Sequence, residues 1–251
     1  MKKKLTKEDN MTLLEHLDEL RKRLTIIVIV NFVAMIFLFG QTDIIMDYLL
    51  NINPGLELVY ITPSELLTVY IKLAFIMAIV ICSPITIYQI WAFVEKGLYK
   101  NEKIYIAISL FFAVGLFIVG VLFCYFLVLP ITLDFFIRIA IAEVSSKISI
   151  DSYVSFVNTM LVSFGIVFEL PVLVFLLTKL RVLKPEILKK NRGLIIVGIF
   201  IAAAFITPPD VISQIMLGVP LTLLMELSIW ICTIVDKTNK KKSDEAENET
   251  V

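Results

Sequence analysis

An all-α integral membrane protein with six transmembrane helices is the fold class that the sequence predicts. Of the 251 residues, 59% are hydrophobic, and the mean hydropathy is +0.90, whereas about half of the residues of soluble domains are apolar. Long apolar segments recur along the chain, and Lys and Arg collect in alternate loops. Lys plus Arg and Asp plus Glu both total 23, so no nucleic-acid partner is indicated.

Six apolar segments are the predicted spans. They lie at Leu24–Phe39, Leu66–Val94, Ile104–Leu129, Tyr153–Thr178, Leu194–Ile206 and Val211–Val235. Since a hydrocarbon core of about 30 Å needs roughly 20 helical residues, the first segment is slightly short and the 13-residue fifth is much too short. The fifth is therefore either a re-entrant helix or a span that thins the bilayer.

Loop charge distinguishes these alternatives. If all six segments cross and the N-terminus is cytoplasmic, 20 of the 23 Lys and Arg residues lie in cytoplasmic regions and only Arg138 and Lys147 lie outside. This is the distribution that the positive-inside rule describes. A re-entrant fifth segment would instead put the last four basic residues outside. We therefore predict a multi-pass protein of the cell membrane, in contact with lipid, with both termini cytoplasmic.

Three regions are expected along the chain. Residues 1–23 form a cytoplasmic amphipathic helix, residues 24–235 the six-span membrane domain, and residues 236–251 a disordered cytoplasmic tail, because that tail is polar and charged. The first helix is expected along the inner membrane surface because leucines recur on one face, at Leu13, Leu17, Leu20 and Leu24. Short helices are also expected outside, at Ile44–Leu50 and, on the membrane surface, at Ile131–Ile141.

Two carboxylates on the cytoplasmic side are candidate binding groups. Glu19 lies on the polar face of the first helix, and Glu102 lies in the short loop after the second span. One interpretation pairs Glu19 with Arg23, four residues along the helix, and Glu102 with Lys103. The other brings Glu19 and Glu102 together as an acidic pair that binds guanidinium groups of a ligand through bidentate hydrogen bonds.

Glu169 is the one charged residue within Ser163–Leu177. A carboxylate at bilayer depth costs several kcal/mol and marks a candidate functional site, and Pro171 interrupts the helix on the same turn. At 1.5 Å per residue, Glu169 and Glu226 lie roughly 24 and 22 Å from the outer ends of their spans. Glu169 is either a structural carboxyl, protonated and hydrogen-bonded to a neighbouring helix, or a polar site for a partner helix. For Glu226, a structural and a functional role both stay open.

Lys72 is the one basic residue inside a predicted span. It lies about 9 Å from the outer end of that span, so its side chain can extend to the outer surface. Glu65 or Asp210, both on the outer side, is its expected partner.

Four stretches resemble the TatC family, the polytopic core subunit of the twin-arginine protein translocase. They are Glu15–Leu24, Ser83–Lys103, Phe164–Leu173 and Ile206–Leu227. The resemblance implies a concave helical bundle that binds twin-arginine signal peptides and exports folded proteins, driven by the proton-motive force. It also implies single-span TatA and TatB partners and a homo-oligomer in the assembled complex.

The resemblance assigns residues to three sites. The signal-peptide site comprises Glu19, Arg21, Pro84, Phe93 and Glu102. The intramembrane polar site, where a TatA or TatB helix docks, comprises Glu169, Thr207, Gln214 and Glu226. The outer-face site comprises Glu65, Lys72 and Asp210.

No enzymatic centre is expected. The chain has no phosphate-binding Gly-rich loop, and its single histidine, His16, is expected to be a solvated helix residue. The three cysteines are not spaced for metal binding, so neither a cofactor nor a metal is predicted. The alternative function is a small secondary transporter in which Glu169 carries a coupling proton, although the internal repeats typical of that class are missing.

Overall fold

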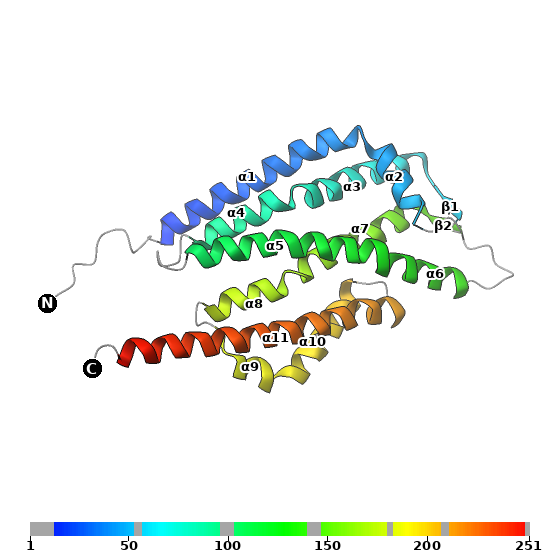
Figure 1. Ribbon diagram of the computed structural model, residues 1–251. Coiled ribbons are helices and arrows are strands. Elements are labelled where there is room, and N and C mark those ends of the chain that lie inside the picture. Colours follow the sequence, from blue (N-terminus) through cyan, green and yellow to red (C-terminus); the bar gives the residue numbers. More distant parts are fainter. Residues whose placement is uncertain are drawn as a thin grey trace.

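The computed structural model describes residues 13–52, 57–95, 103–139, 147–179, 183–206 and 211–248. Its helices lie side by side along one common direction (Figure 1). Five helical stretches are long and apolar enough to cross a membrane: Glu15–Phe39, Pro63–Ile81, Ile108–Arg138, Ile150–Lys179 and Gln214–Lys237. Arg192–Phe205 is apolar but shorter, as the sequence predicts for the fifth segment.

Helix α1 runs without a break from Leu13 to Phe39. The predicted separate helix along the inner surface is therefore wrong for residues 13–23, which extend the first span. No glycine or proline interrupts the helix in this range, and its first turns are tied to a neighbouring helix by the Arg23 side chain. The leucines of the stripe, such as Leu17 and Leu24, are exposed.

Helix α2, Thr42–Leu50, confirms the short helix predicted after the first span. Its Met46 and Leu49 are buried, and the Tyr153 hydroxyl donates a 2.6 Å hydrogen bond to the Leu49 carbonyl. Nearby, strands β1 (Glu57–Val59) and β2 (Lys147–Ser149) pair in parallel, with Leu58 opposite Ile148.

The second span consists of two helices, α3 (Pro63–Ile81) and α4 (Ser83–Glu95), separated by Cys82. Thr62 and Glu65 form a capping box at the start of α3, which satisfies backbone N–H groups that a helix leaves unpaired. Pro84 stands in the first turn of α4, where the missing N–H of proline costs nothing.

The third span continues further than predicted. Helix α5 (Lys103–Phe123) passes through a π-helical turn, Cys124–Val128, into α6 (Leu129–Ile139). The helix predicted at Ile131–Ile141 therefore exists as far as Ile139, but it extends α5 instead of lying on the membrane surface (Figure 1). The π-helical turn is wider than an α-helical turn. It lies just before Pro130 and accommodates this proline, which has no backbone N–H to donate.

The fourth span also has a break. Helices α7 (Ile150–Val167) and α8 (Leu170–Lys179) are separated by Phe168 and Glu169, and Pro171 is the second residue of α8. The main apolar core lies where α7 packs against its neighbours, around fully buried residues such as Phe164, Val157 and Leu73. The break places Glu169 beside a second, smaller apolar cluster, formed by α4, α5 and α8.

The last part of the chain comprises α9 (Pro185–Lys190), α10 (Arg192–Ile206) and α11 (Val211–Asn248). Since α11 is helical to Asn248, the predicted disorder from residue 236 is wrong for residues 236–248. Lys, Glu and Ala are strong helix formers, and extending an existing helix is far easier than starting one. Helix α1 begins and α11 ends at the same end of the bundle, called here the terminal end, while α2, β1 and β2 mark the far end (Figure 1).

Candidate functional site

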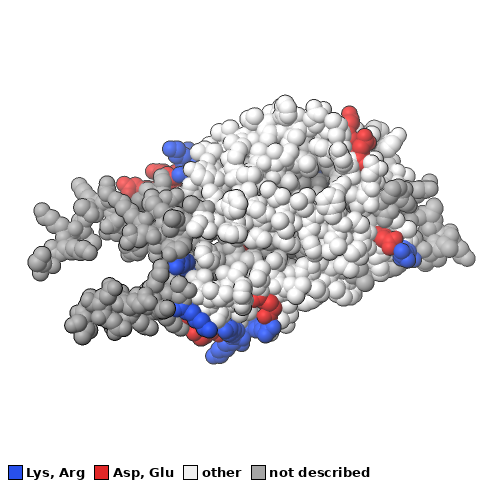
Figure 2. Space-filling model, in the orientation of Figure 1, with Lys and Arg blue, Asp and Glu red and all other residues white. Residues whose placement is uncertain are grey.

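Charged side chains lie mainly at the two ends of the bundle, with a broad uncharged surface between them (Figure 2). This distribution is the one expected of helices whose middle sections face lipid. A further charged group lies on the lower edge of the same view, set inward from the terminal end. The candidate residues fall into four places: the terminal end, the wall around Glu169, the far end, and the α10–α11 pair.

At the terminal end, Arg23 connects α1 to α4. Its Nε donates to Glu19 Oε1 at 2.6 Å, and its Nη1 donates to Gln89 Oε1 at 2.6 Å. The interpretation that pairs Glu19 with Arg23 is thus realised, and the Glu19 side chain is only 10% exposed. Glu102 lies outside the part of the chain that the structure describes, so the acidic pair stays a prediction.

His16 and Phe93 also join α1 to α4 at this end. Their ring centroids lie 4.4 Å apart, so His16 packs on an aromatic ring and is half-buried, contrary to the prediction of a solvated residue. Because His16 lies one turn before Glu19, this contact brings Phe93 near the Glu19–Arg23 pair. Arg21 and Pro84 are exposed.

In the wall of the bundle, Glu169 stands at the break between α7 and α8. Its Oε1 is buried and has no hydrogen-bond partner among the residues that the structure places. The side chain borders a hollow of about 240 Å³ whose other lining residues come from α4 and α8: Ile87, Ile90, Trp91, Leu173 and Leu176. The structural alternative, a hydrogen bond to a neighbouring helix, is not observed for this oxygen.

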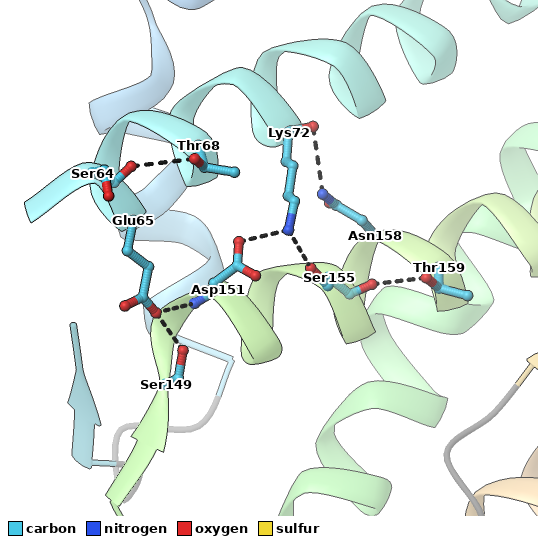
Figure 3. A network of polar contacts seen from close by, with 9 residues as sticks. All are labelled: Ser64, Glu65, Thr68, Lys72, Ser149, Asp151, Ser155, Asn158 and Thr159. Atoms are coloured by element: carbon cyan, nitrogen blue, oxygen red, sulfur yellow. Dashed lines mark hydrogen bonds and ion pairs between the residues drawn. The ribbon is translucent and has the colours of Figure 1, made fainter. Parts of the chain in front are cut away.

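At the far end, Lys72 of α3 pairs with α7 (Figure 3). Its Nζ lies 2.6 Å from Asp151 Oδ1 and 3.0 Å from Ser155 Oγ. The predicted partner Glu65 is wrong, because Glu65 Oε1 accepts hydrogen bonds from the Ser149 hydroxyl and the Asp151 N–H. The other predicted partner, Asp210, is not among the described residues.

In the α10–α11 pair, Gln214 Nε2 donates a 2.9 Å hydrogen bond to the Phe200 carbonyl. Of the predicted docking residues, Gln214 therefore connects α10 to α11. Thr207 lies in segment 207–210, outside the residues that the structure describes. A Cβ on Gly218 would lie 2.6 Å from the Phe200 ring, so the two helices approach closely here.

Glu226 of α11 faces Arg192, the first residue of α10. Arg192 Nε lies 2.5 Å from Glu226 Oε1, an ion pair without the directed geometry of a hydrogen bond. Although Glu226 and Glu169 have similar predicted depths, Glu226 has a cationic partner while Glu169 borders an apolar hollow. Of the two carboxylates, Glu226 is therefore the one that an ion pair ties to a neighbouring helix.

Some contributors were missed by reasoning from the sequence. They are Gln89 of α4, which accepts a hydrogen bond from Arg23 of α1, and Asp151 and Arg192, which pair with the two predicted residues Lys72 and Glu226. Gln89 could have been noticed in the sequence, because its amide stands among mostly apolar side chains in Ile85–Phe93. Asp151 gave no such signal, because an acidic residue in the first turn of a helix is common.

Comparison with known proteins places these features in a family. A family model described as Sec-independent protein translocase protein (TatC) matches residues 15–220. The chain belongs to the TatC family. A TatC of Helicobacter pylori is 40% identical over 93% of this chain and 94% of its own length, and TatC of Escherichia coli is 34% identical over 89% and 88%.

Solved TatC structures agree with the fold. A crystal structure of the twin-arginine translocase receptor TatC superposes with a TM-score of 0.80 at 36% sequence identity, covering 88% of this chain and 99% of that one. The chain is therefore a multi-pass membrane protein of the TatC fold, built from several apolar helices. Its family relatives are protein translocase components, which favours protein transport over the alternative of a small proton-coupled transporter.

Proposed function

We propose that this chain is the receptor subunit of a twin-arginine translocase, which binds the signal peptides of folded cargo and assembles with TatA- and TatB-type single-span subunits. One observation carries the proposal: α1 and α4 meet at the terminal end, where Glu19 pairs with Arg23 and Phe93 packs on His16. The Glu19 carboxylate already holds a guanidinium, that of Arg23, at 2.6 Å. A carboxylate so oriented suits an arginine-bearing peptide.

The orientation in the membrane forms part of the proposal. We place six spans in the bilayer, with α10 as the short fifth, and both termini in the cytoplasm. Support comes from the common end of α1 and α11 (Figure 1) and from the concentration of Lys and Arg in alternate loops. The signal-peptide surface then faces the compartment where cargo folds.

Glu169 is proposed as the polar contact for a partner helix or for the inserted signal peptide. Its unpaired buried oxygen borders the apolar hollow between α4 and α8. A buried polar atom without a partner costs about 1–3 kcal/mol, and a polar side chain brought by an incoming helix would remove that cost. Arg21, Pro84, Glu102, Thr207, Gln214 and Glu226 are proposed as further members of the two binding surfaces.

Peptide binding tests this proposal. Purified protein in detergent is titrated with a signal peptide that carries paired arginines and with one in which both are lysine. We expect the arginine peptide to bind more tightly, because only guanidinium forms bidentate pairs with carboxylates. Glu19→Gln should weaken its binding about tenfold or more, the worth of a charged hydrogen bond.

Asp18→Asn is the matched control, because Asp18 is an exposed acid on the same helix beside Glu19. It should bind like the unchanged protein, and melting curves of both variants should show that they remain folded. Equal affinity for the two peptides, or an equal loss in both variants, would contradict the proposed receptor role of Glu19.

A further inference from the structure

A second hollow lies near the terminal end, at the corner between α9 and α10. It has a volume of about 470 Å³ and is lined by Lys189, Arg192, Glu226, Ile229, Trp230 and Thr233. Because α10 has only 15 residues, this corner lies well inward of the end of α11 (Figure 1). The charged group set inward from the terminal end in Figure 2 lies over these elements.

The lining of this hollow is built for an anion. Glu226 holds Arg192 in place through the 2.5 Å ion pair at Nε, and a guanidinium has further N–H donors for a second acceptor. The Arg192 side chain is 58% exposed, and Lys189 is exposed beside it. With two cations and one carboxylate, the lining carries one net positive charge.

Beyond these charges, the hollow is lined by aromatic and apolar side chains. Trp230 is 63% exposed, and tryptophan is enriched where membrane meets water. An apolar hollow of about 420 Å³ adjoins the charged one at Ile229, which lines both. Leu188, Ile195, Gly198 and Met225 also line it, and a Cβ on Gly198 would meet open space. A polar compartment thus adjoins an apolar one.

We propose that these adjoining hollows bind an anionic phospholipid. Its phosphodiester lies on Lys189 and Arg192, Trp230 packs against the glycerol region, and an acyl chain occupies the apolar hollow. Basic pockets between membrane helices are suited to anionic headgroups. The paired compartments favour a lipid over free phosphate, because free phosphate would leave the apolar hollow without an occupant.

Native mass spectrometry of the full chain in detergent tests this site. The protein is titrated with phosphatidylglycerol, with zwitterionic phosphatidylcholine and with inorganic phosphate. We expect phosphatidylglycerol to bind tightest and Lys189→Gln to weaken it about fivefold, the worth of one basic residue near an anionic lipid. Lys189→Gln removes an exposed side chain without disturbing the Arg192–Glu226 pair, so folding is expected to be unaffected.

Lys184→Gln with Lys190→Gln is the matched control, because these exposed cations lie at the two ends of α9 but do not line the hollow. This control should bind phosphatidylglycerol within about twofold of the unchanged protein, since a charge outside the hollow interacts weakly with its ligand. Gly198→Leu, which narrows the apolar hollow, should weaken the lipid and leave phosphate binding unchanged. Unchanged lipid binding in Lys189→Gln, an equal loss in the control, or inorganic phosphate binding as tightly as the lipid would overturn the proposal.

Discussion

Lys72 of α3 is held against α7 by three side chains of that helix. Its Nζ pairs with Asp151 and Ser155, and Asn158 donates a 3.4 Å hydrogen bond to the Lys72 carbonyl. The Lys72 and Asp151 side chains are 37% and 34% exposed, so solvent screens part of their attraction. The contribution of this ion pair to stability is therefore expected to lie between that of an exposed pair and that of a buried pair.

Removing Lys72 should destabilise the protein moderately. Lys72→Met leaves the Asp151 carboxylate without its cation, and we expect a loss of about 1–2 kcal/mol, between the values for exposed and buried pairs. A melting curve in detergent measures it, and the exchange Lys72→Asp with Asp151→Lys should recover part of the loss. Arg138→Gln is the control, because it breaks the Arg138–Asp134 pair, whose side chains are 77% and 51% exposed. An equal effect at both pairs would contradict the importance of the Lys72 contact.

The important charged residues could be predicted from the sequence more readily than their contact partners. Glu169, Glu226 and Lys72 are recognisable because a charge inside an apolar segment is costly. Their partners come from other helices: Asp151 lies 79 positions from Lys72, and the Arg192–Glu226 pair depends on how α10 and α11 diverge. Such pairings depend on helix rotation and offset, which hydrophobic periodicity does not determine.

Helices α5 and α7 approach closely because each helix contributes a glycine to the contact. Each glycine lies against a phenylalanine from the other side. A Cβ on Gly120 would lie 2.6 Å from the Phe164 carbonyl oxygen and 2.8 Å from the Phe168 ring. A Cβ on Gly165 would lie 2.7 Å from the Phe117 ring. Small residues at helix contacts allow this close packing in membranes. The contact also supports the break that carries Glu169.

Gly120→Ala should therefore weaken this helix pair. The backbone carbonyl of Phe164 cannot move aside as a side-chain end can, and overpacking of this kind costs about 1–3 kcal/mol. Gly115→Ala on the same helix is the control, since a Cβ there meets nothing within 4 Å; it should be neutral or stabilising by up to about 1 kcal/mol. Melting curves in detergent compare the two variants, and similar stabilities would count against the close approach of α5 and α7.

The positions of the apolar helices were predictable, but their junctions were less so. All six predicted segments are helical in the structure apart from the breaks at Cys82 and at Phe168–Glu169, because hydropathy reports directly on contact with lipid. The continuation of α1 through residues 13–23, of α5 into α6, and of α11 to Asn248 was missed. A change from apolar to polar composition marks the edge of a membrane, whereas a helix ends only where caps, glycine or proline stop it.

The whole molecule combines the proposed recognition surface at the terminal end with a polar group inside its wall. Arg23 and the His16–Phe93 contact bind α1 to α4 at the terminal end. From there α4 leads along the hollow bordered by Glu169, and α10, the proposed fifth span, has only 15 residues. A short span locally thins the bilayer, which would bring both membrane surfaces closer to Glu169. A signal peptide bound at the terminal end could then extend toward that carboxylate.

Export of a folded reporter tests this account most directly. Cells lacking their own TatC receive this chain together with single-span TatA- and TatB-type subunits of the same source, and a fluorescent reporter that folds before export carries a twin-arginine signal peptide. We expect the reporter to cross the membrane, and to stay inside when both signal arginines are lysine, because lysine lacks the bidentate fork. Equal export of the two reporters, or no export by an assembled complex, would contradict the account.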